Sequence, residues 1–537
     1  MGEGKKGSSF IKQAAILAAA SMIVRFIGFL YRVPMTAIIG DSGNAIYSAG
    51  YQVYNFLLIL SSAGLPAAIG KMVSERLALK QYRNAHKVFQ VSMTFSSVLG
   101  FIFMVLLALL AKPVAVNICK IPDAYYTLLT LAPTIFIVGI MSVYRGYFQG
   151  MKNMVPTAFS QIVEQLFNAV FSVLLAYLLI DKSVALSAAG GTAGTGIGAL
   201  AGLLIMVFVY WLNSGSIKKR NRRPVNGYEI ESSGEILKIL LFTAVPIIIG
   251  TAIYSITNLV DMSMVMSRLL ESGAFTVHEA ETLYGQLQGK YVVLTTLPVA
   301  ISTSIATAAV PNIAASRALR DRRGVERKIN MAIKISMVIS VPAAIGMAVL
   351  SDQILLMLFP TVPEGGELLR IGSISIIFLA LSQIVTGTLQ GIGRVRIPAI
   401  NAFFGAVTKI IFNYVLIIIP AINVKGAVIS TIACYVVASI LNLRALMKIT
   451  RMRLKLMDLI FKPVIASAVM GAACYGTYKG MFLLLHRNTL STLIAVAVSM
   501  VVYFFVMLFI KGILKEDIYM LPGGRKIASV CEKFSLL

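Results

Sequence analysis

Long apolar segments recur along almost the whole chain, from Phe10 to Lys511, and only short polar loops separate them. Of the 537 residues, 58% are hydrophobic and 13% are charged, which is more apolar surface than the core of a soluble protein can bury. A helix needs about 20 apolar residues to cross a bilayer. The chain is therefore predicted to be an all-α polytopic membrane protein with about fourteen transmembrane helices.

The polar loops delimit the predicted spans. Their ranges are 10–31, 47–69, 88–111, 124–148, 156–180, 184–212, 236–260, 285–310, 329–350, 367–391, 397–419, 424–447, 459–484 and 490–511. Residues 514–537 are expected to form a cytoplasmic tail.

Basic residues are concentrated in every second loop, and this sets the expected orientation. Lysine and arginine near span ends stay on the cytosolic side, whereas acidic residues have little influence. The two most basic examples contain Lys218, Lys219, Arg220, Arg222 and Arg223, and Arg317, Arg320, Arg322, Arg323, Arg327 and Lys328. Both termini are therefore expected in the cytosol.

The formal net charge of +26 follows from these loops. In a soluble protein such a charge would suggest nucleic acid as a partner, but these basic clusters lack the aromatic residues on which bases stack. The expected partners are anionic phospholipid headgroups at the cytosolic surface, and no nucleic acid.

An internal repeat is visible at a nearly constant offset. Tyr47, Tyr54 and Leu60 match Tyr284, Tyr291 and Leu297, and Gln149-Gly150 before Pro156 matches Gln390-Gly391 before Pro398. Transporters are often built from such repeats. The expected organisation is a first lobe at 1–212, a basic cytoplasmic linker at 213–235, a second lobe at 236–450, two further spans within 451–513, and the tail.

No catalytic signature is present in the sequence. There is no phosphate-binding loop of the Gly-x-x-x-x-Gly-Lys type, the 3 histidines lie in separate loops, and the 4 cysteines lack metal-ligand spacing. The chain is expected to be neither an enzyme nor a metal or cofactor protein, so any transport must draw on an ion gradient, the membrane potential or the gradient of the substrate.

Four basic side chains inside the predicted spans are the candidate substrate-binding residues, because a charge in the membrane is costly and usually functional. Arg25 and Arg32 share one helix face, about two turns apart. Lys290 enters the eighth span and Lys409 lies near the middle of the eleventh. Arg25, Arg32 and Lys290 have an alternative role as interfacial residues that extend toward the headgroups.

Four polar residues are candidates for coupling or gating. Glu164 and Asn168 lie one turn apart in the fifth span, and Lys409 and Asn413 have the same spacing in the eleventh. Glu164 either titrates during transport or simply pairs with a buried cation. Asp261, near the outer end of the seventh span, either caps a helix or holds a cation.

The membrane interior thus contains more positive than negative charge, which favours an anionic headgroup over a cationic drug. Arginine suits phosphate in particular, because its planar fork donates paired charge-assisted hydrogen bonds and stays ionised. A lipid pyrophosphate meets this description.

Several motifs resemble those of the MOP exporter superfamily, and in particular its polysaccharide transporters of the stage V sporulation protein B type, relatives of the MurJ lipid II flippases. They are Arg25-Phe26-Ile27-Gly28-Phe29 with Arg32, Gly64-Leu65-Pro66-Ala67-Ala68-Ile69-Gly70-Lys71 with Glu75, Arg145-Gly146-Tyr147-Phe148-Gln149-Gly150 with Pro156, Leu389-Gln390-Gly391-Ile392-Gly393-Arg394, and Lys409 with Asn413. The resemblance covers nearly the whole chain.

The resemblance implies a flippase, working as a monomer in the bacterial plasma membrane, that moves an undecaprenyl-pyrophosphate-linked glycan, with lipid II as the first candidate, to the outer leaflet by alternating access. Two lobes of about six helices would enclose a cationic cavity lined by Arg25, Arg32 and Lys290, and the last two helices would form a groove for the lipid tail. Some relatives hold a sodium ion with an Asn-x-x-x-Asp motif, but here Ile417 follows Asn413.

Other functions stay open at this point. One is a multidrug or cation antiporter of the MATE type, which would favour twelve spans and intramembrane carboxylates. Another is a flippase for a different envelope or spore polysaccharide precursor. A third is a membrane scaffold that recruits envelope machinery through its basic loops, which would leave the buried charges unexplained.

Overall fold

The structure, a computed structural model, describes residues 3–221, 229–318, 320–394, 396–452 and 457–512. Every regular element in these ranges is a helix, as the apolar segments predict, so the all-α fold class is confirmed. The predicted tail at 514–537 and part of the predicted linker at 213–235 lie outside the described residues.

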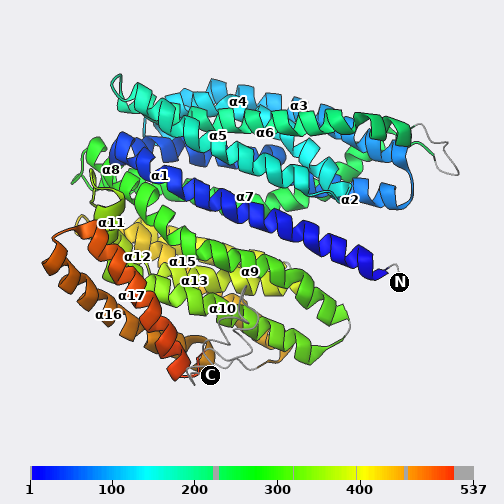
Figure 1. The fold of residues 1–537 in the computed structure, drawn as a ribbon. Helices are drawn as coiled ribbons and strands as arrows, with labels where there is room; N and C mark the ends of the chain where they lie inside the picture. The colour runs from blue at the N-terminus through cyan, green and yellow to red at the C-terminus, as the bar shows by residue number, and fades with distance from the viewer. Residues whose placement is uncertain (1–2, 222–228, 319, 395, 453–456, 513–537) are drawn as a thin grey trace. The chain divides into compact units, whose positions relative to one another are not determined.

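The chain divides into two compact units, Met1–Gly289 and Lys290–Leu537 (Figure 1). The helices of the first unit are α1 (Glu3–Ser62), α2 (Leu65–Ala78), α3 (Tyr82–Pro113), η1 (Val114–Ile118), α4 (Ala124–Gly150), α5 (Val155–Leu179), α6 (Val184–Asn221), α7 (Ser233–Glu271) and α8 (Val277–Gly285). The π-helix η2 (Gln286–Tyr291) crosses the division. The second unit contains α9 (Val292–Ala318), α10 (Arg322–Val349), α11 (Ser351–Leu358), α12 (Gly366–Gly372), α13 (Ser375–Gly391), α14 (Arg396–Leu416), α15 (Lys425–Thr450), η3 (Met457–Phe461), α16 (Lys462–Leu485) and α17 (Asn488–Phe509).

Within the described residues, 11 helices are long and apolar enough to cross a membrane, or 12 if the bent pair α12 and α13 forms one span. The predicted number of fourteen spans is not confirmed. One reason is that Ala19–Ala78 is a continuous helical, apolar segment and therefore gives one candidate span, although α1 folds back on itself at Gly40 inside this segment. The predicted lobe limits, which place α7 in the second half, stay a prediction.

Helix α1 is a hairpin of two arms that reverse at Gly40. The backbone there has φ 68°, a conformation that glycine adopts without steric cost. In a straight helix Tyr31 and Tyr47 would lie about 24 Å apart, but their hydroxyl oxygens are 3.4 Å apart. The Asn44 amide closes the turn, donating to the Gly40 carbonyl at 3.0 Å and to Thr36 Oγ1 at 3.1 Å.

The internal repeat is visible in the backbone of each half. Lys80 ends α2 with φ 60° and donates to the Leu77 carbonyl, and Arg320 ends α9 with φ 56° and donates to the Arg317 carbonyl. After α4 and α13 the same turn recurs, from Lys152 to the Gln149 carbonyl and from Gly393 to the Gln390 carbonyl. The matched Gln-Gly motifs therefore occupy equivalent helix ends.

Helix packing follows the same repeat. A Cβ at Gly150 would lie 2.7 Å from Val73 Cβ and 2.9 Å from the Gly70 carbonyl oxygen, which brings α4 against α2. Its counterpart Gly391 brings α13 against α9, 3.0 Å from the Val310 carbonyl oxygen. Small residues at such crossings allow the close approach on which membrane helices depend. The prediction of two pseudo-symmetric halves is confirmed.

Replacement of Gly150 by alanine should weaken the α2–α4 crossing, because the added methyl group would overlap with Val73 Cβ and the Gly70 carbonyl oxygen, which move only if the helices separate. Overpacking of this kind costs about 1–3 kcal/mol. Thermal unfolding of the purified protein in detergent should show a lower transition temperature for Gly150→Ala. The matched control is Gly480→Ala in α16, where a Cβ meets nothing within 4 Å; equal unfolding temperatures for the two variants would contradict the prediction.

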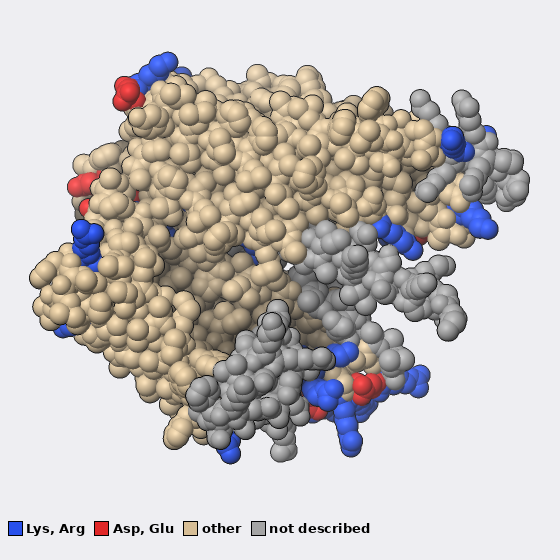
Figure 2. Space-filling view, viewed as in Figure 1, with Lys and Arg blue, Asp and Glu red and all other residues tan. Residues whose placement is uncertain are grey.

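Charged side chains lie mainly near the helix ends. On the face shown in Figure 2, uncharged residues cover most of the lengths of the helices, and most of the visible lysine and arginine side chains gather beyond them. Large apolar side chains such as Phe242, Leu483, Leu484 and Phe509 are highly exposed. Such surfaces suit contact with lipid acyl chains, as expected of a multi-pass membrane protein.

Candidate functional site

Arg32 lies in a cluster of tyrosines between the two arms of α1. Its Cζ is 4.9 Å from the centre of the Tyr47 ring, and Tyr31 and Tyr51 lie within electrostatic range of its guanidinium. The Tyr47 and Tyr51 rings are stacked, with centres 5.7 Å apart and planes at 12°. Arg32 itself is partly exposed. Aromatic side chains thus hold the guanidinium in place in a residue that is only partly buried.

Arg25 lies on the first arm of α1, about two turns before Arg32. Its side chain is exposed, as are its apolar neighbours Met22 and Phe26. Between the two arginines, a Cβ at Gly28 would lie 3.2 Å from the amide nitrogen of Gln165. This region of the first arm therefore faces α5, where Gln165 follows Glu164.

Glu164 forms an ion pair with Arg145 between α5 and α4. The Arg145 Nη2 donates to Glu164 Oε2 at 2.6 Å, and the Arg145 Nε donates to Ser160 Oγ at 3.1 Å. The structure thus shows the pairing that the sequence left as one of two options for Glu164. The carboxylate also lies within electrostatic range of Tyr51, which connects this pair to the Arg32 cluster.

Asn168 and Asn413 bridge equivalent helix pairs in the two halves. Asn168 Oδ1 accepts hydrogen bonds from Ser172 Oγ at 2.8 Å and from Thr195 Oγ1 of α6 at 3.3 Å. Asn413 Oδ1, in α14, accepts a hydrogen bond from Ser430 Oγ of α15. Both side chains are buried, so they hold neighbouring helices together. Their predicted role in coupling stays a prediction.

The two candidate lysines lie in the second unit. Lys290 is 1% exposed, and its Nζ donates to the carbonyls of Val362 at 2.6 Å and Glu364 at 2.9 Å, in the loop between α11 and α12. Two of its three donors are therefore used by the protein. Lys409 is 9% exposed and lies on the same helix as Asn413.

Asp261 is 7% exposed in α7 and lies within electrostatic range of Tyr284 in α8. The Asn-x-x-x-Asp motif of some relatives is incomplete here, because Ile417, directly after α14, has no side-chain ligand atom in the position of the aspartate. Within the described ranges, no group of three His, Cys, Asp or Glu side chains is arranged to hold a metal ion.

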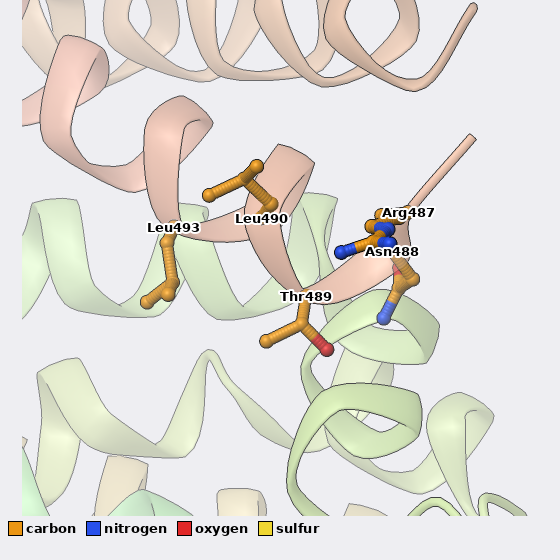
Figure 3. Close-up of a pocket in the computed structure, with 5 residues that line it drawn as sticks. All are labelled: Arg487, Asn488, Thr489, Leu490 and Leu493. Atoms are coloured by element: carbon orange, nitrogen blue, oxygen red, sulfur yellow. The ribbon is translucent and has the colours of Figure 1, made fainter. Parts of the chain in front are cut away.

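A pocket lies at the start of α17, away from these candidate residues in the sequence (Figure 3). Arg487, Asn488, Thr489, Leu490 and Leu493 line it. Asn488 accepts from the Tyr478 hydroxyl at 3.0 Å and donates to the Gln353 carbonyl at 3.0 Å, so its amide fixes the α16–α17 turn to α11. The predicted groove for a lipid tail on the last two helices stays a prediction.

The tyrosines around Arg32 were not predicted as its neighbours. Tyr47 and Tyr54 were noted only as part of the repeat, and Tyr51 was not noted. Their spacing holds the signal, because residues four and three apart share one helix face. Tyr31 could not be found this way, since it comes from the other arm of the hairpin and meets Tyr47 only after the chain reverses.

Comparison with known proteins identifies the family. The family model described as "Polysaccharide biosynthesis protein" matches residues 10–317, more than half of the chain. The chain belongs to this family. The model described as "MatE" matches residues 292–415 in addition. Together the two matches confirm membership of the MOP superfamily, so the chain is a membrane transporter and not an enzyme.

Curated relatives from Bacillus subtilis (strain 168) are similar along most of their length. The uncharacterized membrane protein YabM is 27% identical, over 96% of this chain and 95% of YabM. Stage V sporulation protein B is 26% identical, over 84% of this chain and 86% of that protein. The lipid II flippase MurJ is 25% identical, over 80% of this chain and 81% of MurJ.

Solved structures of the MOP superfamily have the same fold. The lipid II flippase MurJ in an inward closed conformation matches with a TM-score of 0.68 at 15% identity, covering 93% of this chain and 99% of MurJ. An inward-facing multidrug resistance MATE family transporter matches with a TM-score of 0.66 at 17% identity, covering 80% of this chain and 95% of that transporter. The MATE/MurJ-like fold is therefore confirmed.

Proposed function

We propose that this transporter is a flippase that moves an undecaprenyl-pyrophosphate-linked glycan, with lipid II as the first candidate, from the inner to the outer leaflet by alternating access. The observation that carries the proposal is Arg32, a partly exposed residue of an apolar helical unit whose guanidinium lies over the Tyr47 ring. The family membership and the similarity to the MurJ and stage V sporulation proteins support the same conclusion.

The chemistry of this site favours an anion over a cation. A guanidinium donates five N–H groups in a planar fork and remains charged at every physiological pH, which suits the oxygens of a diphosphate. Arg25, exposed about two turns away on the same arm, provides a second cation for the headgroup. The carboxylate of Glu164 is neutralised by Arg145, so it does not repel an anion strongly.

The lysines have a smaller role in this proposal. Lys290 contributes a positive charge to the protein interior. Its ammonium already donates hydrogen bonds to the carbonyls of Val362 and Glu364, so it is a weaker candidate for direct contact with the headgroup. Lys409 remains a candidate contact for the headgroup. A membrane potential positive outside favours outward movement of an anion by about 2.3 kcal/mol per charge at 100 mV.

The proposed setting is the bacterial plasma membrane, with both termini in the cytosol and the chain acting as a monomer. The basic loops that end α6 and connect α9 to α10 would then face anionic headgroups of the inner leaflet. In this orientation the lipid-linked glycan enters from the side on which it is made.

Complementation of a bacterial strain depleted of its lipid II flippase tests the proposal. Rescue of growth, together with increased exposure of lipid II on the outer leaflet in an accessibility assay, is the expected result. The comparison strain lacks stage V sporulation protein B, which tests a glycan lipid of the spore envelope as the substrate. Rescue of neither strain, combined with efflux of a cationic dye, would contradict the proposal and favour a MATE-type antiporter.

A further inference from the structure

Arg32 differs from Arg76 and Arg145, two other arginines packed between helices of the first unit, in what holds it. Arg76 pairs with Glu231, and Arg145 pairs with Glu164. Arg32 lies over the Tyr47 ring, and no carboxylate of the described residues lies within ion-pair distance of it. A positive charge in an apolar environment normally takes a carboxylate partner. The Tyr47 ring and the Tyr31 hydroxyl, which accepts a hydrogen bond from the guanidinium, take the place of a carboxylate, and the remaining N–H groups stay available.

An aromatic ring and a carboxylate differ in how much of the guanidinium's charge and hydrogen-bonding capacity they leave free. A carboxylate accepts hydrogen bonds from the N–H groups of the guanidinium and neutralises its charge. Neither the N–H groups nor the charge is then available to an anionic ligand. An aromatic ring attracts the flat face of the guanidinium and leaves the charge and the N–H edge available. Arg32 is thus oriented without being neutralised.

Tyr47 is itself rigidly placed. It is 1% exposed, its hydroxyl is 3.4 Å from that of Tyr31, and its ring stacks on Tyr51. On the α6 side Gly191 lies beside the ring, and a Cβ there would be in ordinary van der Waals contact with Tyr47 Cδ2, at 3.5 Å. A ring fixed on several sides can hold a guanidinium in one orientation.

We propose that Tyr47 is a positioning residue for the diphosphate of the substrate: its ring holds the Arg32 guanidinium by its face and so presents the N–H fork to the phosphate oxygens. This rests on the proposed function, because it assumes that Arg32 binds the pyrophosphate. Tyr47 does not contact the substrate and acts only through Arg32.

The test measures binding of a polyprenyl pyrophosphate to purified protein in lipid nanodiscs. The variants are Tyr47→Phe, Tyr47→Leu, Arg32→Gln and the double variant Arg32→Gln/Tyr47→Leu. Tyr47→Phe should bind like the unmodified protein, because the ring remains. Tyr47→Leu should lose about tenfold in affinity. The double variant should bind like Arg32→Gln alone, because Tyr47 has nothing left to position.

The control and the second probe separate positioning from folding. Tyr284→Leu removes the repeat-related tyrosine, which is equally buried, and should leave pyrophosphate affinity unchanged. If Tyr47→Leu does not yield folded protein, Tyr47→Met, which fills the space with a flexible apolar side chain, takes its place with the same expectation.

Two results would overturn the proposal in distinguishable ways. If Arg32→Gln weakens binding but loss of the Tyr47 ring has no effect, or weakens binding by the same factor with and without Arg32, the positioning role is wrong and the proposed function stands. If Arg32→Gln binds the pyrophosphate as tightly as the unmodified protein, the proposed headgroup site and the positioning role fail together.

Discussion

Replacement of Arg25 and Arg32 together by glutamine is expected to abolish transport while the protein still folds and inserts. Each hydrogen bond from a charged group contributes about 1.5–3 kcal/mol, so loss of one at each arginine costs about 3 kcal/mol or more. That corresponds to at least about a hundredfold loss in affinity for the headgroup. The measurement is the leaflet-accessibility assay of the lipid-linked glycan, with protein level quantified in the same membranes.

A matched control removes a cation from an aromatic ring elsewhere in the chain. The Lys479 Nζ lies 4.6 Å from the centre of the Tyr475 ring in α16, and Lys479→Gln should leave transport unchanged. The single variants Arg25→Gln and Arg32→Gln should each reduce transport. Normal transport by the double arginine variant would show that the positive charges of the first arm of α1 do not bind the substrate.

The fold could be predicted from the sequence because the bilayer imposes a simple rule. An apolar run of sufficient length must be a helix, since every backbone polar group has to be satisfied within the segment. The repeat was also readable, because the Gln-Gly motifs at 149–150 and 390–391 end equivalent helices. The number of spans was harder to predict, since the reversal of α1 depends on the backbone angles of a single residue, Gly40.

The partners of the charged side chains could not be predicted, because they come from segments far apart in the sequence. Arg145 was named only in a motif at the end of the span 124–148, and the structure pairs it with Glu164 of the next helix. Lys290 was predicted to line a cavity, and the structure places two carbonyls of the α11–α12 loop on its ammonium. Spacing along one helix identifies a shared face, but only the packing of helices determines what that face meets.

The partner of Arg76 could not be predicted either, because it is Glu231, 155 residues away in the sequence. Arg76 lies between the predicted spans 47–69 and 88–111, in one of the loops expected at the cytosolic surface, but its side chain is 7% exposed. It forms a two-pronged contact with Glu231, including Arg76 Nε to Glu231 Oε1 at 2.8 Å. Lys87 Nζ donates to the Glu231 carbonyl at 2.6 Å, and the Asn84 side chain bonds to the Glu231 N–H. These contacts tie the segment before α7 to α2 and α3.

The contacts of Glu231 also fix the start of α7. Ser232 caps the helix, and the first apolar residues, Ile236 and Leu240, are fully buried in the core formed with α2 and α3. If Glu231 is replaced by glutamine, the Arg76 guanidinium stays buried without its counter-ion, and α7 loses its fixed starting point. Breaking a buried pair in this way costs about 3–5 kcal/mol, although the partial exposure of Glu231 favours the lower end.

Thermal unfolding in detergent should therefore show a large destabilisation for Glu231→Gln and a much smaller one for Arg76→Met/Glu231→Gln. The double variant removes the unpaired charge and fills its place with an apolar side chain, and such replacements are often close to neutral. Glu75→Gln is the control, because its pair with Lys71 is exposed and 4.0 Å long, and exposed pairs contribute at most about 1 kcal/mol. Equal effects of Glu231→Gln and Glu75→Gln would mean that Arg76 finds water or another partner, and that α7 is held by its apolar residues alone.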